Sequence, residues 1–467
     1  MVIYKSIETL FDDFAIKDHA SLSFHHHLRN GDAVMNLVLN TCIKRNLTHM
    51  NLYPSGIFPV HTALFKMIQS NRVTHLKTNY LNGSVYDAIN TYGVKGDFTM
   101  QSHGGRARAI IEKETSIDYA FIAVSAADLK GNATGLEGKN ILGSLGYAME
   151  DLTHAKTVIL VTDTLKETLE TPQISHEFVD AILEVDSIGD SKGIVSGTLE
   201  ITNDPLGLKI ARETMRVLKT SGLIKDNVSF QSGAGGISLA ITKMFNEYLK
   251  THHLKAAFYT GGITAHHVKA LNDGLVSFLY DVQCFDLEAI KSLKENPAHK
   301  YMSASDYANP NNLARKIGDL DIVILGATEV DLGYNVNVTT DSLGRIIGGS
   351  GGHSDTSEDA TLTIIVSPLL KGRMPLIKDK VNTITTEGKH VDIIVTERGI
   401  AINPNRKDLI QKLSQANLPL MSIESLQAKA HALSGIPKPL ARSSAIIGSI
   451  ENRHGTCIDQ LYQRSDV

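Results

Sequence analysis

The stretch Gly348-Gly349-Ser350-Gly351-Gly352-His353-Ser354-Asp355 is the starting point for predicting the fold. It follows an Asn-rich segment, residues 335–340, and precedes residues 360–366, an apolar β-branched run that predicts a buried strand. The glycines therefore lie in a loop. Their backbone can approach a ligand closely and direct N–H groups at an anion or a developing oxyanion. By itself, such a cluster is equally consistent with a surface turn.

The neighbourhood of this loop occurs twice in the chain. Six matches recur in the same order at a nearly constant spacing of about 205 residues, which predicts a tandem duplication. The matching pairs are residues 16–18 with 224–226, Tyr53 with Tyr259, 118–128 with 321–331, 143–146 with 349–352, 155–161 with 360–366, and 179–183 with 391–395. The boundary is expected near Ser221-Gly222, giving domains 1–221 and 222–467.

Each copy alternates short apolar strands with helical segments, a pattern typical of an α/β fold with a mainly parallel sheet flanked by helices. Ligands of such sheets bind outside the carboxyl ends of the strands, where the glycine-rich loops lie. We expect the two copies to pack with these edges facing one cleft. Residues from Asn405 onward are interpreted as packing elements, and the lack of a low-complexity linker predicts one rigid unit.

Composition excludes several classes of protein. The chain has 467 residues, 42% of them hydrophobic, and its 46 basic and 50 acidic residues give a net charge of −4. This balance argues against general binding to nucleic acid or to membrane surfaces. Three scattered cysteines indicate neither a disulfide framework nor a thiolate metal site. Acidic residues near the start and the absence of a long apolar run predict a soluble cytoplasmic protein.

Eight stretches together carry a family resemblance over almost the whole chain. They are residues 23–32 (SFHHHLRNGD), 101–106 (QSHGGR), 143–148 (GSLGYA), 231–236 (QSGAGG), 261–264 (GGIT), 334–338 (YNVNV), 348–355 (GGSGGHSD) and 392–401 (DIIVTERGIA). With these stretches in this order, the chain resembles the citrate lyase α subunits of the coenzyme A transferase superfamily.

The resemblance implies two tandem-duplicated domains of the coenzyme A transferase type. It also implies citrate CoA-transferase activity, in which citrate displaces acetate from an acetyl thioester and a citryl thioester forms. The thiol would belong to a phosphoribosyl-dephospho-coenzyme A group on an acyl carrier (γ) subunit, with coenzyme A or acetyl-coenzyme A as a surrogate. A β subunit would cleave the product. We expect an oligomer and no metal, nucleic acid or membrane.

A carboxylate that attacks a thioester needs donors for the developing oxyanion. Backbone N–H groups of Gly235, Gly236 and the run Gly349, Ser350, Gly351, Gly352 are the candidates. Glycine suits these positions because a Cβ would crowd the acyl carbon.

Citrate brings three carboxylates, so its pocket must be locally positive. Arg29 and Arg106 are the predicted cations, because a guanidinium binds a carboxylate in a bidentate manner. The alternative for either arginine is a solvated surface charge. His25, His27 and His103 are expected to donate to citrate or to pack in the core. His353 and Asp355 are expected to bind substrate or only to close the loop.

Three successive histidines also raise the possibility of a metal site. On a strand, His25 and His27 face one way and His26 the other, and no cysteine or paired carboxylate accompanies them. No metal site is therefore expected.

Many coenzyme A transferases use a covalent glutamate in a loop of the second domain. Here the corresponding residues 261–271 contain no carboxylate, which predicts direct attack by citrate without a glutamyl intermediate. Glu397 is the reserve nucleophile. The alternatives are a glutamate-dependent transferase or hydrolase of a simpler acid, and a non-catalytic sensor of small molecules on the same fold.

Overall fold

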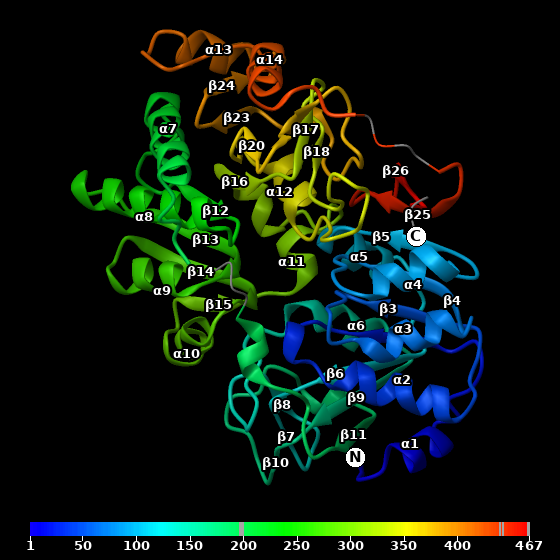
Figure 1. Cartoon of the computed structure of the whole chain (residues 1–467). Coiled ribbons are helices and arrows are strands. Elements are labelled where there is room, and N and C mark those ends of the chain that lie inside the picture. The colour runs from blue at the N-terminus through cyan, green and yellow to red at the C-terminus, as the bar shows by residue number, and fades with distance from the viewer. Residues whose placement is uncertain (196–199, 439, 441–442, 465–467) are drawn as a thin grey trace.

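A computed structural model describes residues 1–195, 200–438, 440 and 443–464. The chain forms two large sheets flanked by helices, one in the blue half of Figure 1 and one in the green-to-orange half. The main cluster of buried apolar side chains includes Leu22 of the first sheet and Phe230 of the second. The core therefore continues from one half into the other.

The first sheet is parallel apart from its last hairpin. Its strands, in order across the sheet, are β1 (Val2–Tyr4), β11 (Ala181–Glu184), β9 (Thr157–Thr162), β6 (Tyr119–Ala123), β2 (Ser21–Phe24), β3 (Met50–Pro54), β4 (Val73–Thr78), β5 (Phe98–Met100), β25 (Ile446–Glu451) and β26 (Cys457–Tyr462).

The second sheet is parallel apart from the β23–β24 pair. Its strands, in order, are β15 (His299–Tyr301), β14 (Val276–Cys284), β13 (Ala256–Ile263), β12 (Ser229–Ser232), β16 (Ile322–Gly326), β19 (Leu362–Val366), β23 (Ile393–Thr396) and β24 (Gly399–Ile402). Strands β11-β9-β6-β2-β3-β4-β5 of the first sheet have the order β23-β19-β16-β12-β13-β14-β15 of the second. The predicted α/β fold with a duplicated, mainly parallel sheet is confirmed.

Helices and small sheets complete each half. The helices are α1 (Ile7–Asp13), α2 (Val34–Lys44), α3 (Thr62–Gln69), α4 (Val85–Tyr92), α5 (His103–Ile111), α6 (Met149–His154), α7 (Pro205–Ser221), α8 (Gly236–Thr251), α9 (Ala265–Asn272), α10 (Leu287–Glu295), α11 (Ala304–Ala308), α12 (His353–Asp359), α13 (Lys407–Leu413) and α14 (Ile423–Ser434). The small sheets contain β10 (Leu165–Lys166), β7 (Ala126–Asp128) and β8 (Ala133–Thr134); β18 (Val336–Asn337), β17 (Glu329–Asp331) and β22 (Ile377–Lys378); and β20 (Leu370–Lys371) with β21 (Met374–Pro375).

Repeated aspartates show the duplication at the level of single hydrogen bonds. Asp118 accepts from the backbone N–H of Ser21 at the start of β2, and Asp321 accepts from that of Ser229 at the start of β12. Asp180 and Asp392 cap the starts of β9 and β19 in the same way. A carboxylate thus satisfies the first N–H of β2 and β12 and the second N–H of β9 and β19, at corresponding places in both halves.

Two segments depart from the predicted boundary at Ser221-Gly222. Helix α7 lies before that boundary but packs on α8 and on β19 and β23 of the second sheet. Figure 1 shows α7 beside α8. Strand β25 lies far beyond it but pairs with β5 of the first sheet. The division into 1–221 and 222–467 stays a prediction. We propose instead to group α7 with the second half and residues 446–462 with the first.

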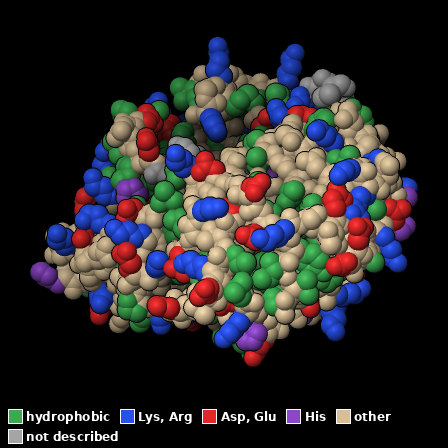
Figure 2. All heavy atoms as spheres, turned by 90° about the horizontal axis from the view of Figure 1, so that it is seen from below, with side chains coloured by type: hydrophobic (Ala, Val, Ile, Leu, Met, Phe, Trp, Pro, Cys, Tyr) green, Lys and Arg blue, Asp and Glu red, His purple; other side chains and the backbone are tan. Residues whose placement is uncertain are grey.

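No helix in the described part of the chain is long and apolar enough to cross a bilayer. The three cysteines are free, with Cys42 and Cys284 buried and Cys457 exposed. Figure 2 shows basic and acidic side chains interspersed over one face, as the small net charge predicts, and a hollow in that face.

Candidate functional site

The glycine loop of the second half crosses to the first half. Gly351 forms a parallel bridge with Ser102, and the His103 N–H donates to the Gly351 carbonyl oxygen over 2.9 Å. A Cβ on Gly349 would clash with the Asn79 carbonyl oxygen, so only glycine fits there. Helix α12 starts at His353, so the loop is shorter than the sequence predicts.

The corresponding loop of the first half, residues 143–146, crosses in the opposite direction. The Ser144 hydroxyl donates to the Asp281 carbonyl oxygen over 2.8 Å. Gly146 lies so close to the second half that an added Cβ would be 2.5 Å from the carbonyl oxygens of Val282 and Met302. Tyr147 then reaches back to His103, to which Gly351 is also bonded. Both glycine loops therefore lie between the two halves and meet at His103.

Five aromatic rings form one cluster, called here the ring cluster: His25, His26, His27, His103 and Tyr147. The Tyr147 ring centroid lies 4.6 Å from that of His26 and 4.4 Å from that of His103. Burial lowers the pKa of His103 to about 3, and it also lowers the pKa values of His26 and His27. These imidazoles are therefore neutral at physiological pH, each with one N–H donor and one acceptor nitrogen.

Several buried nitrogen atoms of the ring cluster lack a partner. The Nδ1 atoms of His25 and His103 and the Nε2 atom of His27 make no hydrogen bond to any described residue. Buried polar atoms are normally satisfied, so three exceptions in one cluster point to a polar ligand or to ordered water. The predicted roles of these three histidines stay predictions.

Arg29 stands next to the ring cluster and bridges the two halves. Its guanidinium carbon lies 5.7 Å from the Phe58 ring of the first half and 4.8 Å from the Phe285 ring of the second. Its φ of 52° is strained for a residue with a Cβ. Burial lowers its pKa, and no carboxylate pairs with it among the described residues. A half-buried cation held by two aromatic rings and no acid is suited to binding an anionic ligand.

Arg106, the other predicted citrate cation, is already paired. It contacts both carboxylate oxygens of Asp151 at 3.1 Å, the Ser23 hydroxyl at 2.8 Å and the Tyr147 carbonyl at 3.1 Å. Burial raises the pKa of Asp151, but Arg106 and His25 lower it further, to about 2. The charge of Arg106 is therefore compensated within the first half, and its role as a citrate ligand stays a prediction.

His353 and Asp355 fix the start of α12. The two ring nitrogens of His353 lie 2.7 Å from the Thr386 hydroxyl and 3.0 Å from the Gly326 carbonyl. Asp355 is buried and accepts from the Gly104 N–H over 2.8 Å. Burial lowers the pKa of His353 to about 4 and raises that of Asp355 to about 6. These contacts hold the loop, while substrate binding by either residue stays a prediction.

The predicted oxyanion donors fall into two groups. The N–H groups of Gly349, Ser350 and Gly352 make no hydrogen bond to another described residue, and the loop is partly accessible. Gly235 and Gly236 start helix α8 at the end of β12, with Gly235 exposed. No hydrogen bond among the described residues joins that turn to the ring cluster.

Glu397 lies at the β23–β24 turn. One carboxylate oxygen accepts from the Leu369 N–H over 2.9 Å, and the other lies 3.6 Å from Arg398 Nε. A cavity of about 330 Å³ beside it is lined by Thr396, Arg398, Lys209, Glu213, Arg216, Asn417, Leu418 and Pro419. Neither glycine loop contributes to that cavity.

Sequence reasoning missed His26, Tyr147 and Phe285 as site residues. Tyr147 follows the first-half copy of the glycine loop, and His26 stands between two histidines that were singled out, so both had a signal. The sequence gives no such signal for Phe285, because its contact with Arg29 of the other half appears only in the structure. In the described part of the chain, no three His, Cys, Asp or Glu side chains are grouped to hold a metal ion.

Comparison with known proteins places this chain in a family. A family model described as citrate lyase, alpha subunit, matches residues 2–464. The citrate lyase alpha chain of Klebsiella pneumoniae is 38% identical over 99% of this chain and 91% of its own length. That of Haemophilus influenzae is 39% identical over 99% and 92%.

Solved structures agree with this assignment. A citrate lyase alpha subunit from Streptococcus mutans, in complex with citrate, superposes with a TM-score of 0.96 at 42% identity and covers 99% of this chain and 91% of its own. A Pseudomonas malonate decarboxylase hetero-tetramer in complex with malonate has a chain with a TM-score of 0.69 at 14% identity, covering 92% and 83%, which shows a shared fold. The chain therefore belongs to the family of citrate lyase alpha subunits, the citrate CoA-transferase component of that enzyme.

Proposed function

We propose that citrate binds between the two halves, against Arg29 and the ring cluster, and attacks an acetyl thioester held at the glycine loop. The observation that carries this proposal is the uncompensated guanidinium of Arg29, beside histidine nitrogens that lack partners. Neutral histidines and a permanent cation suit a tricarboxylate, because they add donors without adding a carboxylate that would repel it.

The reaction exchanges one carboxylate for another. A citrate carboxylate oxygen forms a bond to the thioester carbonyl carbon, and the C–S bond breaks. The thiolate departs, and a citryl-acetyl anhydride remains. The thiolate then attacks the citryl carbonyl carbon, and acetate departs with the anhydride oxygen. Both steps pass through an oxyanion. The free N–H groups of Gly349, Ser350 and Gly352 are the proposed donors, each contributing about 2.7–4 kcal/mol to transition-state stabilisation.

The thioester arm has a route to this loop at the carboxyl ends of β16 and β19. A cavity of about 230 Å³ is lined there by Thr328, Asp341, Ser342, Leu343, Ile347, Ser367, Pro368, Lys371, Met374 and Leu376. Ile347 directly precedes Gly348, and Lys371 has no acidic partner among the described residues. Apolar walls suit a pantetheine-like arm and the lysine suits its phosphate.

No glutamyl intermediate is required by this arrangement. The loop of residues 261–271 carries no carboxylate, and Glu397 uses its carboxylate to hold the Leu369 N–H and to face Arg398. These contacts support direct attack by citrate over the glutamate-dependent alternative.

The partners follow from the proposed reaction. The arm would be the phosphoribosyl-dephospho-coenzyme A group of an acyl carrier subunit, and a citryl lyase subunit would take the product. Assembly into an oligomer and a location in the cytoplasm remain parts of this proposal.

A coupled assay of acetate release from acetyl-coenzyme A or acetyl-carrier tests the proposal. We expect release only when citrate is present, with formation of an equal amount of citryl thioester. Release at the same rate without citrate would identify a hydrolase. Exchange with simple acids but not with citrate would favour the glutamate-dependent transferase. Citrate binding without turnover on either thioester would favour a sensor.

A further inference from the structure

Each half places a buried carboxylate on the start of a helix in the other half. Asp355 of α12 accepts from the N–H of Gly104, at the start of α5 in the first half, over 2.8 Å. Glu150 of α6 in the first half accepts from the N–H of Ser305, at the start of α11, over 2.7 Å. Asp355 is 0% and Glu150 3% exposed. The two contacts are therefore sealed between the halves.

The two contacts occupy corresponding positions of the duplication. Helices α5 and α11 follow the corresponding strands β5 and β15, and α6 and α12 precede the corresponding strands β9 and β19. Exchanging the two halves therefore turns one contact into the other. Two similar carboxylates at corresponding positions, each bonded across the boundary, form a reciprocal pair.

Each carboxylate lies just beyond a glycine loop. Asp355 is three residues after Gly352, and its partner Gly104 directly follows His103. Glu150 is four residues after Gly146, in the segment that also carries Tyr147. Each carboxylate therefore joins the segment after a glycine loop to the opposite half.

We propose that Glu150 and Asp355 are reciprocal positioning residues, which hold the two glycine loops in register with His103 across the boundary between the halves. This inference rests on the proposed function for the site at His103. Neither residue is assigned a contact with substrate. The unpartnered Oε2 of Glu150 and Oδ1 of Asp355 show that only one oxygen of each is needed for the bond.

The charged groups around each carboxylate are few. Arg453 and Glu358 act on Asp355, and its other polar neighbours include Ser102, Tyr147 and Tyr307. Arg106 acts on Glu150, whose other polar neighbours are Ser303 and the Ser305 N–H. Burial raises the pKa of Glu150 to about 7 and that of Asp355 to about 6. A neutral acid still accepts through its carbonyl oxygen, so Gln and Asn can replace these residues as acceptors.

The test compares Asp355→Ala and Glu150→Ala with Asp355→Asn and Glu150→Gln. We expect the alanine variants to lose about 10- to 100-fold in kcat with less than about threefold change in the KM for citrate, because misplacement by about 1 Å can cost that much. The amide variants should recover most of the rate. Asp204→Ala is the control, because Asp204 caps α7 within one half through the Gly207 N–H. It should lower the unfolding temperature without changing kcat.

Hydrogen exchange separates this inference from the proposed function. Asp355→Ala should speed exchange of the Gly104 amide, and Glu150→Ala that of the Ser305 amide, whether or not the protein turns over citrate. Wild-type protein without citrate-dependent acetate release would overturn the proposed function alone. Alanine variants with wild-type kcat, or amide variants as slow as the alanine variants, would overturn the positioning role. Unchanged exchange at both amides would overturn the contacts themselves.

Discussion

At the scale of single residues, Arg29 and Arg106 have similar neighbours in the sequence but different surroundings in the structure. Both follow histidines and precede or open a helix, so sequence alone gave them the same role. Asp151 compensates Arg106, whereas no described acid compensates Arg29. The difference depends on a carboxylate far along the chain, which the local pattern around either arginine does not contain.

Replacing Arg29 by Ala should raise the KM for citrate by about 10- to 100-fold, because a hydrogen bond to a charged group contributes about 1.5–3 kcal/mol. The KM for the acetyl thioester should change by less than about threefold. Steady-state kinetics with each substrate varied in turn measures both. Arg216→Ala is the control, since Arg216 pairs with Glu213 on the surface. Equal increases in both KM values would remove Arg29 from the citrate pocket.

Replacing Arg106 by Ala should mainly destabilise the fold. It leaves the buried Asp151 charge without its cation, which costs about 3–5 kcal/mol. Urea unfolding, monitored by circular dichroism, measures this loss in the free energy of unfolding. The double variant Arg106→Met with Asp151→Leu should recover part of it. If Arg106→Ala instead keeps full stability and raises only the citrate KM, Arg106 is a citrate ligand after all.

Replacing Glu397 by Gln should leave kcat within about twofold, because the amide oxygen can still accept from the Leu369 N–H. A covalent nucleophile would lose several orders of magnitude on the same change. Borohydride treatment after incubation with acetyl thioester, followed by mass spectrometry, should find no modified glutamate. Detection of such an adduct on any glutamate would refute direct attack by citrate.

At the scale of elements, α6 and α12 depend on contacts from the opposite half. They have 6 and 7 residues, too few to be stable as isolated helices. Sequence periodicity finds the long amphipathic helices such as α8 and the buried strands such as β19, because their signals are local. It missed α12, because the five residues of glycine loop before it, 348–352, carry no helical pattern, and its contacts come from residues far along the chain, Gly104 and Thr386.

The buried carboxylates of α6 and α12 give stability an unusual pH dependence. Their folded pKa values, about 7 for Glu150 and about 6 for Asp355, lie above the ordinary 4.5 and 3.8. The two acids therefore hold their protons more tightly in the folded state than in the unfolded state. This proton binding stabilises the fold fully below about pH 4, and the stabilisation is lost as the pH rises to about 7. The double variant Glu150→Gln with Asp355→Asn has no acid to titrate at these positions, so it does not lose this stabilisation as the pH rises. Its stability relative to wild type should rise from pH 4 to pH 7 in urea unfolding, and a constant difference would refute the assignment.

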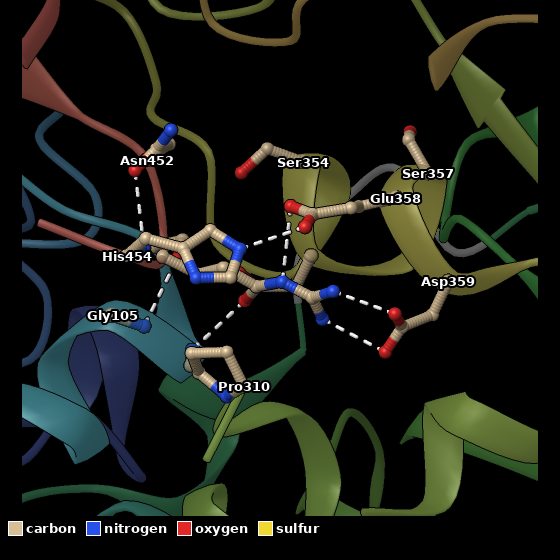
Figure 3. Close-up of polar contacts among 12 residues, drawn as sticks. Gly105, Pro310, Ser354, Ser357, Glu358, Asp359, Asn452 and His454 are labelled. Carbon is tan, nitrogen blue, oxygen red and sulfur yellow. Dashed lines mark hydrogen bonds and ion pairs between the residues drawn. The ribbon is translucent and has the colours of Figure 1, made fainter. Parts of the chain in front are cut away.

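At the scale of the whole molecule, the last hairpin ties the two halves together. In Figure 3, Asn452 and His454 of the turn between β25 and β26 lie on the same side as Gly105 of α5, and the His454 ring points toward Glu358 of α12. Arg453, 3% exposed, donates to Asp359 at 2.6 and 2.8 Å. It also forms an ion pair with Glu358 at 3.0 Å, while its carbonyl accepts from Arg108. The sequence marked this region only as packing, because the acids that pair with Arg453 are about 95 residues away.

Replacing Arg453 by Met should loosen this hairpin. Asp359 keeps Arg315 as a partner, so the fold should survive, but amide exchange in residues 446–462 should rise well above that in wild type. Burial raises the pKa of Asp359, but Arg453 and Arg315 lower it more, to about 2. The ion pairs therefore contribute stability above about pH 4 that is lost as the pH falls to about 2. Wild type should lose more stability than the variant over that range. Equal losses, or unchanged exchange, would show that the hairpin is held in other ways.

The pairing of β25 with β5 also has a consequence for how the protein is made. A ribosome releases residues 1–195 long before residues 446–462, so the β5 edge stays uncovered while the second half is synthesised. An uncovered edge strand can pair with strands of other nascent chains. Newly made chains are therefore most exposed to aggregation before residues 446–462 emerge, because this hairpin covers the β5 edge of the first half.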